Sequence, residues 1–571
     1  MATFGERFLL GFTSPRNPHL ISEYVKVIEK HKLDGMDYNI KFQELFYDVL
    51  SKEKVAGVET GTAKDKALAG RDKLTRMPQV LGFFITQQNK KFKVTEAGKL
   101  LLNDSLFDDV LVHQILKFQL PSALHKEKDT NKGYFRIKPF LELLRLIDKM
   151  EYLTYNEFLT YGMTFTNYKN FDKVVNDIND YRKRRDAAKR NKESLRNFEH
   201  QNRVDTFKAL YQDIIASGNI KTRESQTNTT DKYVKKKLSN LSDYADSIFR
   251  LFQASGLVIN SKGRSLQINP KRKDEVDYIL ENVSREILPV EISRDDFDKY
   301  ITNPRIPVLL NDSKENILNT LKKLGDTNSN KSEDIYDLKV KLNEMRNKEK
   351  LKLVRNQIKS LKSRRDPDIA DVINTFEQIS NKEIEPANLR PTYLEWNVWR
   401  AMTMINHGNV VGNFIVDDMG NPIATAGGGQ SDIIGDYGEF KIGIEVTLST
   451  GMKQYEMEGE PVSRHIGELQ KQGPAFGIFI ADKLSDTVIS HFYISSIANT
   501  KVYNGRVDII PMSTATFVEF FEKAVKKDLQ PSDLYQIHEH SLRMSKQFLF
   551  EEKTEKDWHK SVISEILNLV S

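Results

Sequence analysis

The chain has 571 residues, of which 29% are charged, 39% are hydrophobic and none is cysteine, and its formal net charge is +6. Without cysteine, the chain can form no disulfide and no thiolate zinc site, and it has no cysteine nucleophile. No apolar run reaches the roughly 18 residues of a membrane helix, and the first residues lack the features of a signal peptide. We therefore expect a cytoplasmic protein of about three to five domains with no membrane partner.

The charge is unevenly distributed along the chain. Residues 385–571 hold 17 Lys and Arg against 25 Asp and Glu, a net charge of −8, which leaves +14 for residues 1–384. A basic body joined to an acidic C-terminal part is typical of a nucleic-acid binder with a carboxylate-rich, metal-dependent site. Charge asymmetry between domains is also common without any such role, so charge alone leaves both interpretations open.

Residues 1–150 have the pattern of a mixed α/β domain with short helices. Apolar spacing predicts helices over 20–32 and 42–50, then strands over 83–86 and 92–94 around a polar turn, and a new helix from Thr95. Helices followed by a hairpin and a helix outline a winged helix, so we interpret this part as a first DNA-recognition subdomain. Arg71, Lys73 and Arg76 precede a turn at Pro78 and are candidate DNA contacts.

Residues 151–300 repeat this outline and are the second predicted recognition subdomain. A helix over 243–253 precedes strands over 256–259 and 266–268, and Lys262 and Arg264 lie at the hairpin tip, where a wing would meet phosphates. Residues 181–203 hold nine basic and three acidic residues. Arg184 and Arg185 in this stretch are candidate phosphate contacts, although a solvated helix surface explains the same composition.

Residues 301–384 are predicted to form a helical linker. A helix over 313–324 ends at Gly325, a plausible C-terminal cap. The long charged helix expected over 336–361 keeps no continuous heptad spacing, which favours a spacer or helical hairpin over a coiled-coil dimer.

From residue 385 to 571 the pattern is that of an α/β domain. We expect a helix over 393–405 and strands over 414–416, 442–447 and 476–481. The last strand is almost continuously apolar, as a central strand buried on both faces should be.

Two acidic residues 13 positions apart carry the chemistry of this domain. Strand alternation places Lys441, Gly443, Glu445 and Thr447 on one face. If Asp432 begins the paired strand of a hairpin, its carboxylate and that of Glu445 face one point. Mg²⁺ accepts one or two carboxylates and keeps several waters, and it can polarise a phosphoryl oxygen and activate a bound water.

This spacing is the outline of the PD-(D/E)xK nuclease core, with Ser431 in place of the proline and Thr447 in place of the lysine. A hairpin with two exposed acids fits the bare pattern equally well. Glu395 on the preceding helix, and Glu458 with Arg464 and His465 after the strand, favour the nuclease interpretation.

The chain resembles the AlwI family of type IIS restriction endonucleases, which includes strand-specific nicking enzymes. The similarity lies in the runs LEWNVW (394–399), AGGGQSD (426–432), GIEVT (443–447) and YEMEGEPVSRH (455–465). It extends to TEAGK (95–99), QLPS (119–122) with His125 and Lys126, and GLV (256–258) through NP (269–270).

The resemblance implies a multidomain α+β protein: a winged-helix or helix-turn-helix recognition region, a helical linker, and a C-terminal α/β PD-(D/E)xK nuclease core. It implies that Asp432 and Glu445 bind Mg²⁺, one ion or two, with the Val446 carbonyl as a third ligand. Glu395 and Glu458 match further active-site acids, and His465 matches a histidine beside the scissile phosphate. Lys441 and Lys453 are candidates for positioning the attacking water.

The resemblance further implies that the protein binds a short asymmetric site in double-stranded DNA and cuts a few bases to one side. The second strand would need transient self-association through the cleavage domain or a small nuclease subunit, and a cognate DNA methyltransferase would be the genetic partner. A nicking endonuclease, a repair or transposition nuclease with the same core, and a catalytically silent DNA-binding protein are the alternatives.

Overall fold

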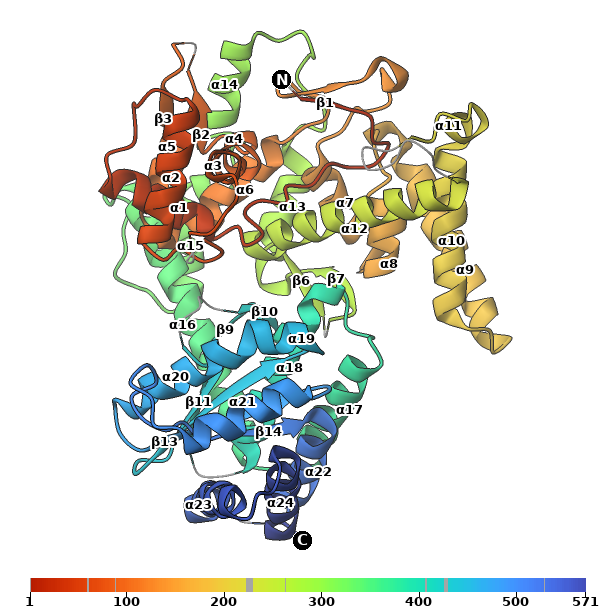
Figure 1. Cartoon of the computed structure of the whole chain (residues 1–571). Helices are drawn as coiled ribbons and strands as arrows, with labels where there is room; N and C mark the ends of the chain where they lie inside the picture. Colours follow the sequence, from red (N-terminus) through yellow and green to blue (C-terminus); the bar gives the residue numbers. More distant parts are fainter. Residues whose placement is uncertain are drawn as a thin grey trace. The chain divides into compact units, whose positions relative to one another are not determined.

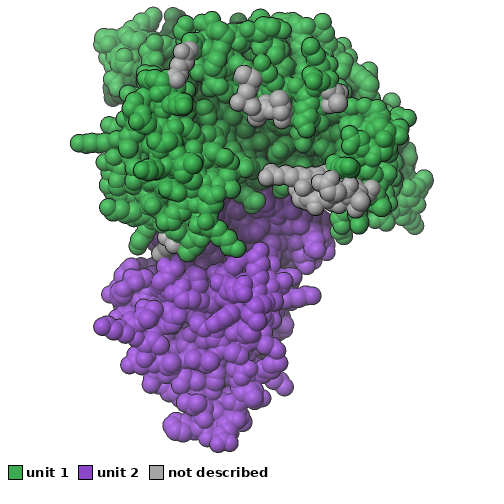
Figure 2. All heavy atoms as spheres, turned by 45° about the horizontal axis from the view of Figure 1, so that its top comes forward, with its two compact units in different colours: residues 1–349 green, residues 350–571 purple. Residues whose placement is uncertain are grey.

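The computed structural model describes residues 2–58, 61–87, 89–221, 229–261, 263–405, 408–425, 430–527 and 529–571. The protein is mixed α+β, mostly helical with several sheets (Figure 1). It divides into two compact units, unit 1 (Met1–Glu349) and unit 2 (Lys350–Ser571), which Figure 2 colours separately. Within the described residues, the helices all lack the length and apolar character needed to cross a membrane.

The first helices of unit 1 form where apolar spacing predicts them. Helix α1 (Leu20–Lys30) buries Tyr24 and Ile28, and α2 (Ile40–Lys52) begins at Asn39, whose side chain accepts a hydrogen bond from the Phe42 amide at 3.0 Å. Polar N-caps of this kind satisfy amides that the helix leaves unpaired. Helices α3 (Lys66–Thr75) and α4 (Met77–Val80) follow.

The first predicted hairpin is confirmed. Strands β2 (Phe84–Thr86) and β3 (Phe92–Val94) pair antiparallel, and Thr95 caps α5 (Glu96–Leu100) by accepting a hydrogen bond from the Gly98 amide at 3.1 Å. The other elements in the first part of unit 1 are β1 (Ala2–Phe4), α6 (Phe107–Lys117), β4 (His125–Glu127), α7 (Pro139–Met150), β5 (Leu153–Thr154) and α8 (Tyr155–Glu157).

The second predicted hairpin is also present, but its surroundings are larger than predicted. Strands β6 (Val258–Ser261) and β7 (Ser265–Ile268) pair antiparallel, and β5 adds a third strand beside β7 that the sequence did not indicate. The helix expected from residue 243 is α12 (Thr230–Ser255), which starts 13 residues earlier and ends at Gly256 with φ of +69°. The winged-helix interpretation of both hairpins remains a prediction.

The basic stretch of residues 181–203 lies on two helices, α9 (Phe171–Arg190) and α10 (Leu195–Leu210). Tyr181 of α9 stacks on Phe198 of α10, with ring centroids 5.9 Å apart. Unit 1 continues with α11 (Gln212–Ala216), α13 (Lys273–Asn282), α14 (Arg294–Thr302) and α15 (Lys314–Lys323).

The long helix of the predicted linker belongs partly to each unit. Helix α16 (Ile335–Lys362) packs Leu338 and Leu342 against Ile317 and Leu321 of α15, and its last turns lie in unit 2. A helical hairpin is one of the two arrangements, hairpin or spacer, that the sequence left open for this segment. After a break at 363–365, α17 (Asp366–Ser380) begins with Pro367 in its first turn, where proline is tolerated.

Within the described residues, unit 2 contains a five-stranded sheet in the order β14-β13-β12-β11-β8. Strands β12 (Lys441–Thr447), β13 (Ala475–Ala481) and β14 (Ile509–Ser513) are parallel, whereas β11 (Ile433–Asp436) runs antiparallel to β12 and to β8 (Asn409–Gly412). All seven residues of β13 are buried, as predicted for a central strand.

Helices cover the sheet and hold the residues of the site. Helices α20 (Glu460–Gln470) and α21 (Asp486–Ile497) pack on β13 through a core that includes Ile466, Phe479 and Phe492. Helix α18 (Arg390–Ile405) packs against β12 and β8. The remaining elements are β9 (Phe414–Val416), β10 (Pro422–Thr425), α19 (Met452–Gln454), the π-helical turn η8 (Tyr455–Gly459), α22 (Thr514–Ala524), α23 (Pro531–Phe550) and α24 (Glu555–Leu569).

Candidate active site

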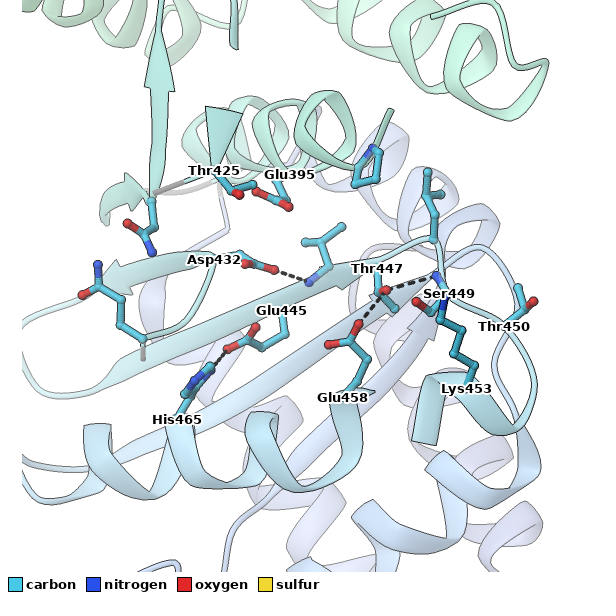
Figure 3. A pocket seen from close by; sticks show the side chains of 15 residues that line it. Glu395, Thr425, Asp432, Glu445, Thr447, Ser449, Thr450, Lys453, Glu458 and His465 are labelled. Atoms are coloured by element: carbon cyan, nitrogen blue, oxygen red, sulfur yellow. Dashed lines mark hydrogen bonds and ion pairs between the residues drawn. The ribbon is translucent and has the colours of Figure 1, made fainter. Parts of the chain in front are cut away.

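A cavity of about 750 Å³ opens in unit 2 where β12 ends (Figure 3). The five side chains that the sequence singled out as catalytic all line it, although they come from different elements. The lining residues are Pro391, Glu395, Asn413, Thr425, Gln430, Asp432, Glu445, Val446, Thr447, Leu448, Ser449, Thr450, Lys453, Glu458 and His465.

The hairpin of β11 and β12 brings Asp432 and Glu445 together. Its register pairs Ile433 with Ile444, so Asp432, one residue before β11, comes level with Glu445. The Val446 amide donates a hydrogen bond to Asp432 Oδ2 at 2.9 Å, which fixes the orientation of this carboxylate. The spacing of 13 residues therefore places both acids as the hairpin prediction required.

Glu445 is 5% exposed and has a histidine partner from the covering helix. His465 of α20 places Nδ1 2.8 Å from Glu445 Oε1. Helix α20 approaches β12 closely because position 443 is glycine: a Cβ there would lie 2.4 Å from Ile466 Cδ1. A larger residue at 443 would therefore require the side chains of α20 that face it to move.

Thr447 occupies the position at which a PD-(D/E)xK core has its lysine, and its side chain forms hydrogen bonds within the site. Its hydroxyl donates to Glu458 Oε1 at 2.8 Å and accepts from the Ser449 amide at 3.1 Å. Glu458 lies in η8, and π-helical turns are frequent at functional sites. Thr447 therefore orients an acid instead of supplying a cation.

The Glu395 carboxyl is buried among the other three acids of the site. It is 6% exposed, and its Oε2 is buried without a hydrogen-bond partner. Burial and the carboxylates of Asp432, Glu445 and Glu458 raise its pKa to about 10. Burial and the Glu445 carboxylate likewise raise the pKa of Asp432, and burial raises the pKa of Glu458. Ionisation of all four acids together is therefore unfavourable without a cation, and a bound cation would favour their charged forms.

The donor set suits a hard divalent cation. Among the described residues, no group of three or more Asp, Glu or His side chains is arranged to hold a metal ion. Mg²⁺ does not require such a group, because it binds through one or two carboxylates and retains several waters. The adjacent Asp432 and Glu445 and the unpaired Oε2 of Glu395 therefore fit Mg²⁺.

Of the two lysines that were candidates for positioning the attacking water, one lines the cavity and the other does not. Lys441 is not among the lining residues, and its Nζ donates to Gln472 Oε1 at 3.0 Å. Lys453 of α19 lines the cavity. Four polar lining residues have no signal in the sequence, because isolated amides and hydroxyls in loops and strand ends form no pattern: Asn413, Thr425, Ser449 and Thr450. Gln430, which also lines the cavity, belongs to the AGGGQSD run (426–432).

The candidate DNA contacts of the first subdomain lie on and after α3. Arg76 is 2.7 Å from Asp72 Oδ2 and donates to the Thr13 hydroxyl at 2.7 Å, and Arg71 Nη2 is 3.7 Å from Asp72 Oδ1. Lys73 lies in the last turn of α3.

The other candidates lie on α9 and in the β6–β7 hairpin. Arg184 pairs with Asp180 at 2.9 Å, and Arg185 pairs with Glu199 at 2.7 Å, so both guanidinium groups are engaged within the protein. Arg264 is exposed after the hairpin tip, whereas Lys262 lies outside the described residues. Residues 426–429 of the AGGGQSD run also lie outside them.

The buried carboxylate cluster lies where β12, the middle strand of the five-stranded sheet, ends. An acid cluster that fits Mg²⁺ is suited to hydrolytic chemistry. The sequence model of the AlwI restriction endonuclease family matches residues 79–520. The chain belongs to this family, and it is a site-specific DNA endonuclease.

Two solved structures also resemble parts of the chain. One is the small subunit (R.BspD6I2) of the heterodimeric restriction endonuclease R.BspD6I, with 26% identity and a TM-score of 0.28 over 35% of this chain and 98% of that one. The other is the BpuJ1 endonuclease binding domain in complex with modified DNA, with 13% identity and a TM-score of 0.32 over 50% of this chain and 92% of that one. No curated protein matches the chain.

Proposed function

We propose that this endonuclease is a type IIS enzyme. Residues 1–300 bind a short asymmetric site in double-stranded DNA through two winged-helix-like subdomains, 1–150 and 151–300. Residues 301–384 connect them to a PD-(D/E)xK cleavage domain, 385–571, which hydrolyses a phosphodiester bond a few bases to one side. The observation that carries the proposal is the convergence of four carboxylates and one histidine on one cavity.

Mg²⁺ is the proposed cofactor, as one ion or two. Asp432 and Glu445 would hold it, with the Val446 carbonyl as a further ligand, and the cation would polarise the phosphate and lower the pKa of a bound water. Glu395, which lines the same cavity, would contribute its unpaired Oε2 to this ion.

The remaining side chains position the reactants. Thr447 holds Glu458, whose carboxylate orients the attacking water, and Glu445 holds the ring of His465 against the scissile phosphate. Water attacks phosphorus and gives up a proton, the bond from phosphorus to the leaving oxygen breaks, and the leaving oxygen takes up a proton.

The family context extends the proposal beyond the site. We assign the enzyme to the cytoplasm, with a DNA methyltransferase of the same specificity as its genetic partner. A site- and strand-specific nicking endonuclease is the second candidate, because the described part of the chain contains one such acid cluster. The presence of all four acids argues against a catalytically silent DNA-binding protein.

The test is Asp432→Asn. The change keeps the side-chain shape but removes a metal-binding charge, so cleavage in Mg²⁺ should fall by at least about a hundredfold. Site-specific binding, measured by gel shift without metal, should stay unchanged. Asp436→Asn, at the other end of β11, is the matched control, because Asp436 does not line the cavity. Cleavage by Asp432→Asn near the wild-type rate would refute the assignment of the active site.

A further inference from the structure

We propose that Lys453 binds a non-bridging oxygen of the scissile phosphate and supplies the positive charge that the missing strand lysine would have given. The inference rests on the proposed function, and it adds a catalytic residue to that site. It begins from the charges that line the cavity.

The ionisable side chains that line the cavity are mainly acidic. Four carboxylates line it, and Lys453 is the one lysine or arginine among its described lining residues. His465 also lines it, but its Nδ1 is bonded to Glu445 at 2.8 Å. A DNA phosphate is an anion, so a cationic side chain beside these acids would favour its approach.

The strand position that carries a lysine in the PD-(D/E)xK pattern holds no cationic side chain in this protein. Thr447 occupies the lysine position on β12, and its hydroxyl is engaged with Glu458 and with the Ser449 amide. Lys441, the alternative on the same strand, is bonded to Gln472 and does not line the cavity. Lys453 lies six residues beyond Thr447 and is the cation that remains.

The backbone that carries Lys453 is held in place from both sides. Gly451, with φ of +63° and ψ of −149°, makes the turn before α19 in a conformation that favours glycine. Next to Lys453, the fully buried Gln454 donates to the carbonyls of Ser449 at 2.8 Å and Lys483 at 2.9 Å, and accepts from the Ser485 amide at 2.8 Å.

This arrangement presents a long side chain from a fixed base. Lys453 is exposed, and in Figure 3 it extends from α19 toward Ser449 at the rim of the cavity. Four methylene groups give the ammonium reach into the cavity while Gln454 fixes the main chain.

The role is electrostatic and involves no proton transfer by the lysine. As water adds to phosphorus and the bond to the leaving oxygen breaks, negative charge grows on the non-bridging oxygens. An ammonium that donates a hydrogen bond to one of them stabilises the transition state more than the ground state.

The absence of cysteine makes a chemical-rescue experiment possible. In full-length Lys453→Cys the new thiol is unique, and 2-bromoethylamine converts it into an aminoethyl thioether of nearly the same length as lysine. We expect the single-turnover cleavage rate of Lys453→Cys to fall about 100- to 1,000-fold. Aminoethylation should raise the cleavage rate of Lys453→Cys at least tenfold. The neutral adduct formed with iodoacetamide should leave the rate of the variant unchanged.

Three controls separate this role from a structural one. The cysteine-free wild type should be unaffected by either reagent, Lys441→Cys should cleave at the wild-type rate before modification, and metal-free affinity for site DNA should be the same in all variants. Mass spectrometry gives the extent of alkylation.

Two outcomes would overturn the inference: a Lys453→Cys rate within about threefold of wild type, or complete aminoethylation without recovery. Either result leaves the proposed function standing if Asp432→Asn is inactive, so the two failures are distinguishable.

Discussion

Glu395 shows how the charge of the site acts on a single residue. Its carboxyl is buried near three other acids, and the resulting pKa of about 10 keeps it protonated in the metal-free protein at neutral pH. In the unfolded chain the same group ionises near pH 4.5. Between these two values the folded state binds the extra proton, so the free energy of unfolding falls as pH rises. The site is therefore destabilising until a cation enters.

Replacing this group with a neutral isostere removes the penalty. We expect Glu395→Gln to raise the melting temperature of the metal-free protein at pH 8, by about 2–4 °C for each kcal/mol gained. The gain should shrink as pH falls toward 4.5, because the unfolded wild-type chain then also keeps its proton. Differential scanning calorimetry in EDTA at several pH values measures both effects.

The matched control is Glu377→Gln, an exposed change on α17 that should alter the melting temperature little. A metal-free Glu395→Gln protein that melts below wild type at pH 8 would show that the carboxyl is not destabilising.

At the scale of elements, the α9–α10 pair divides its basic residues into two sets. Arg184 and Arg185 are neutralised by Asp180 and Glu199. Five others near the turn between the helices are exposed and, among the described residues, form no ion pair: Lys183, Lys189, Arg190, Lys192 and Arg196. The second set is the stronger candidate for contacts to DNA phosphates, because no internal pair must be broken.

We therefore predict that replacing Lys189, Arg190 and Lys192 by Gln weakens binding to site and non-site DNA alike. Each lost phosphate contact should reduce the slope of log K against log salt concentration by about 0.9. Fluorescence anisotropy over a salt series measures the slope. The double change Arg184→Gln and Arg185→Gln is the comparison, and it should alter the slope less. The reverse order of effects would show that the paired arginines face the DNA.

The same scale shows what sequence patterns reveal and what they miss. Residues 83–94 were predictable as a hairpin because apolar runs flank a polar turn, and Asp432 met Glu445 because strand pairing alone fixes their register. Strand β5 was not predictable, since two residues carry no periodicity. The task of Gln454 was hidden as well, because three hydrogen bonds to distant backbone groups leave no trace in the local sequence.

At the scale of the whole molecule, part of the predicted linker packs within unit 1 through ion pairs of α16. Lys339 of α16 bridges Asp109 at 2.8 Å and Asp312 at 2.7 Å, and the fully buried His113 lies 3.0 Å from Asp312. Burial opposes ionisation of Asp312, but His113 and Lys339 outweigh it and hold its pKa near 2. Breaking such a buried network costs about 3–5 kcal/mol. The first turns of α16 are therefore held within unit 1 by this network, and the last turns of the helix belong to unit 2.

The number of strands cut follows from the number of centres. One cluster of carboxylates can align one in-line attack, and the described part of unit 2 contains one such cluster. A double-strand break therefore needs a second centre, from another copy or from a small subunit. Since α16 pairs with α15 through Leu338 and Leu342, those residues are not available for a constitutive coiled coil, and we expect a monomer in solution.

On plasmid DNA we predict nicked circles first and linear DNA afterwards, with a second step whose rate rises with enzyme concentration as copies pair transiently through the cleavage domain. A concentration series with gel quantification of both products measures this dependence, and the inactive Asp432→Asn protein supplies the matched additive. If pairing supplies the second centre, excess inactive protein should slow linearisation while the first nick continues. Nicked circles that never become linear at any concentration would identify a nicking enzyme or a missing small subunit. Linear DNA produced at a rate independent of enzyme concentration would contradict the single centre itself, because one cluster would then have cut both strands.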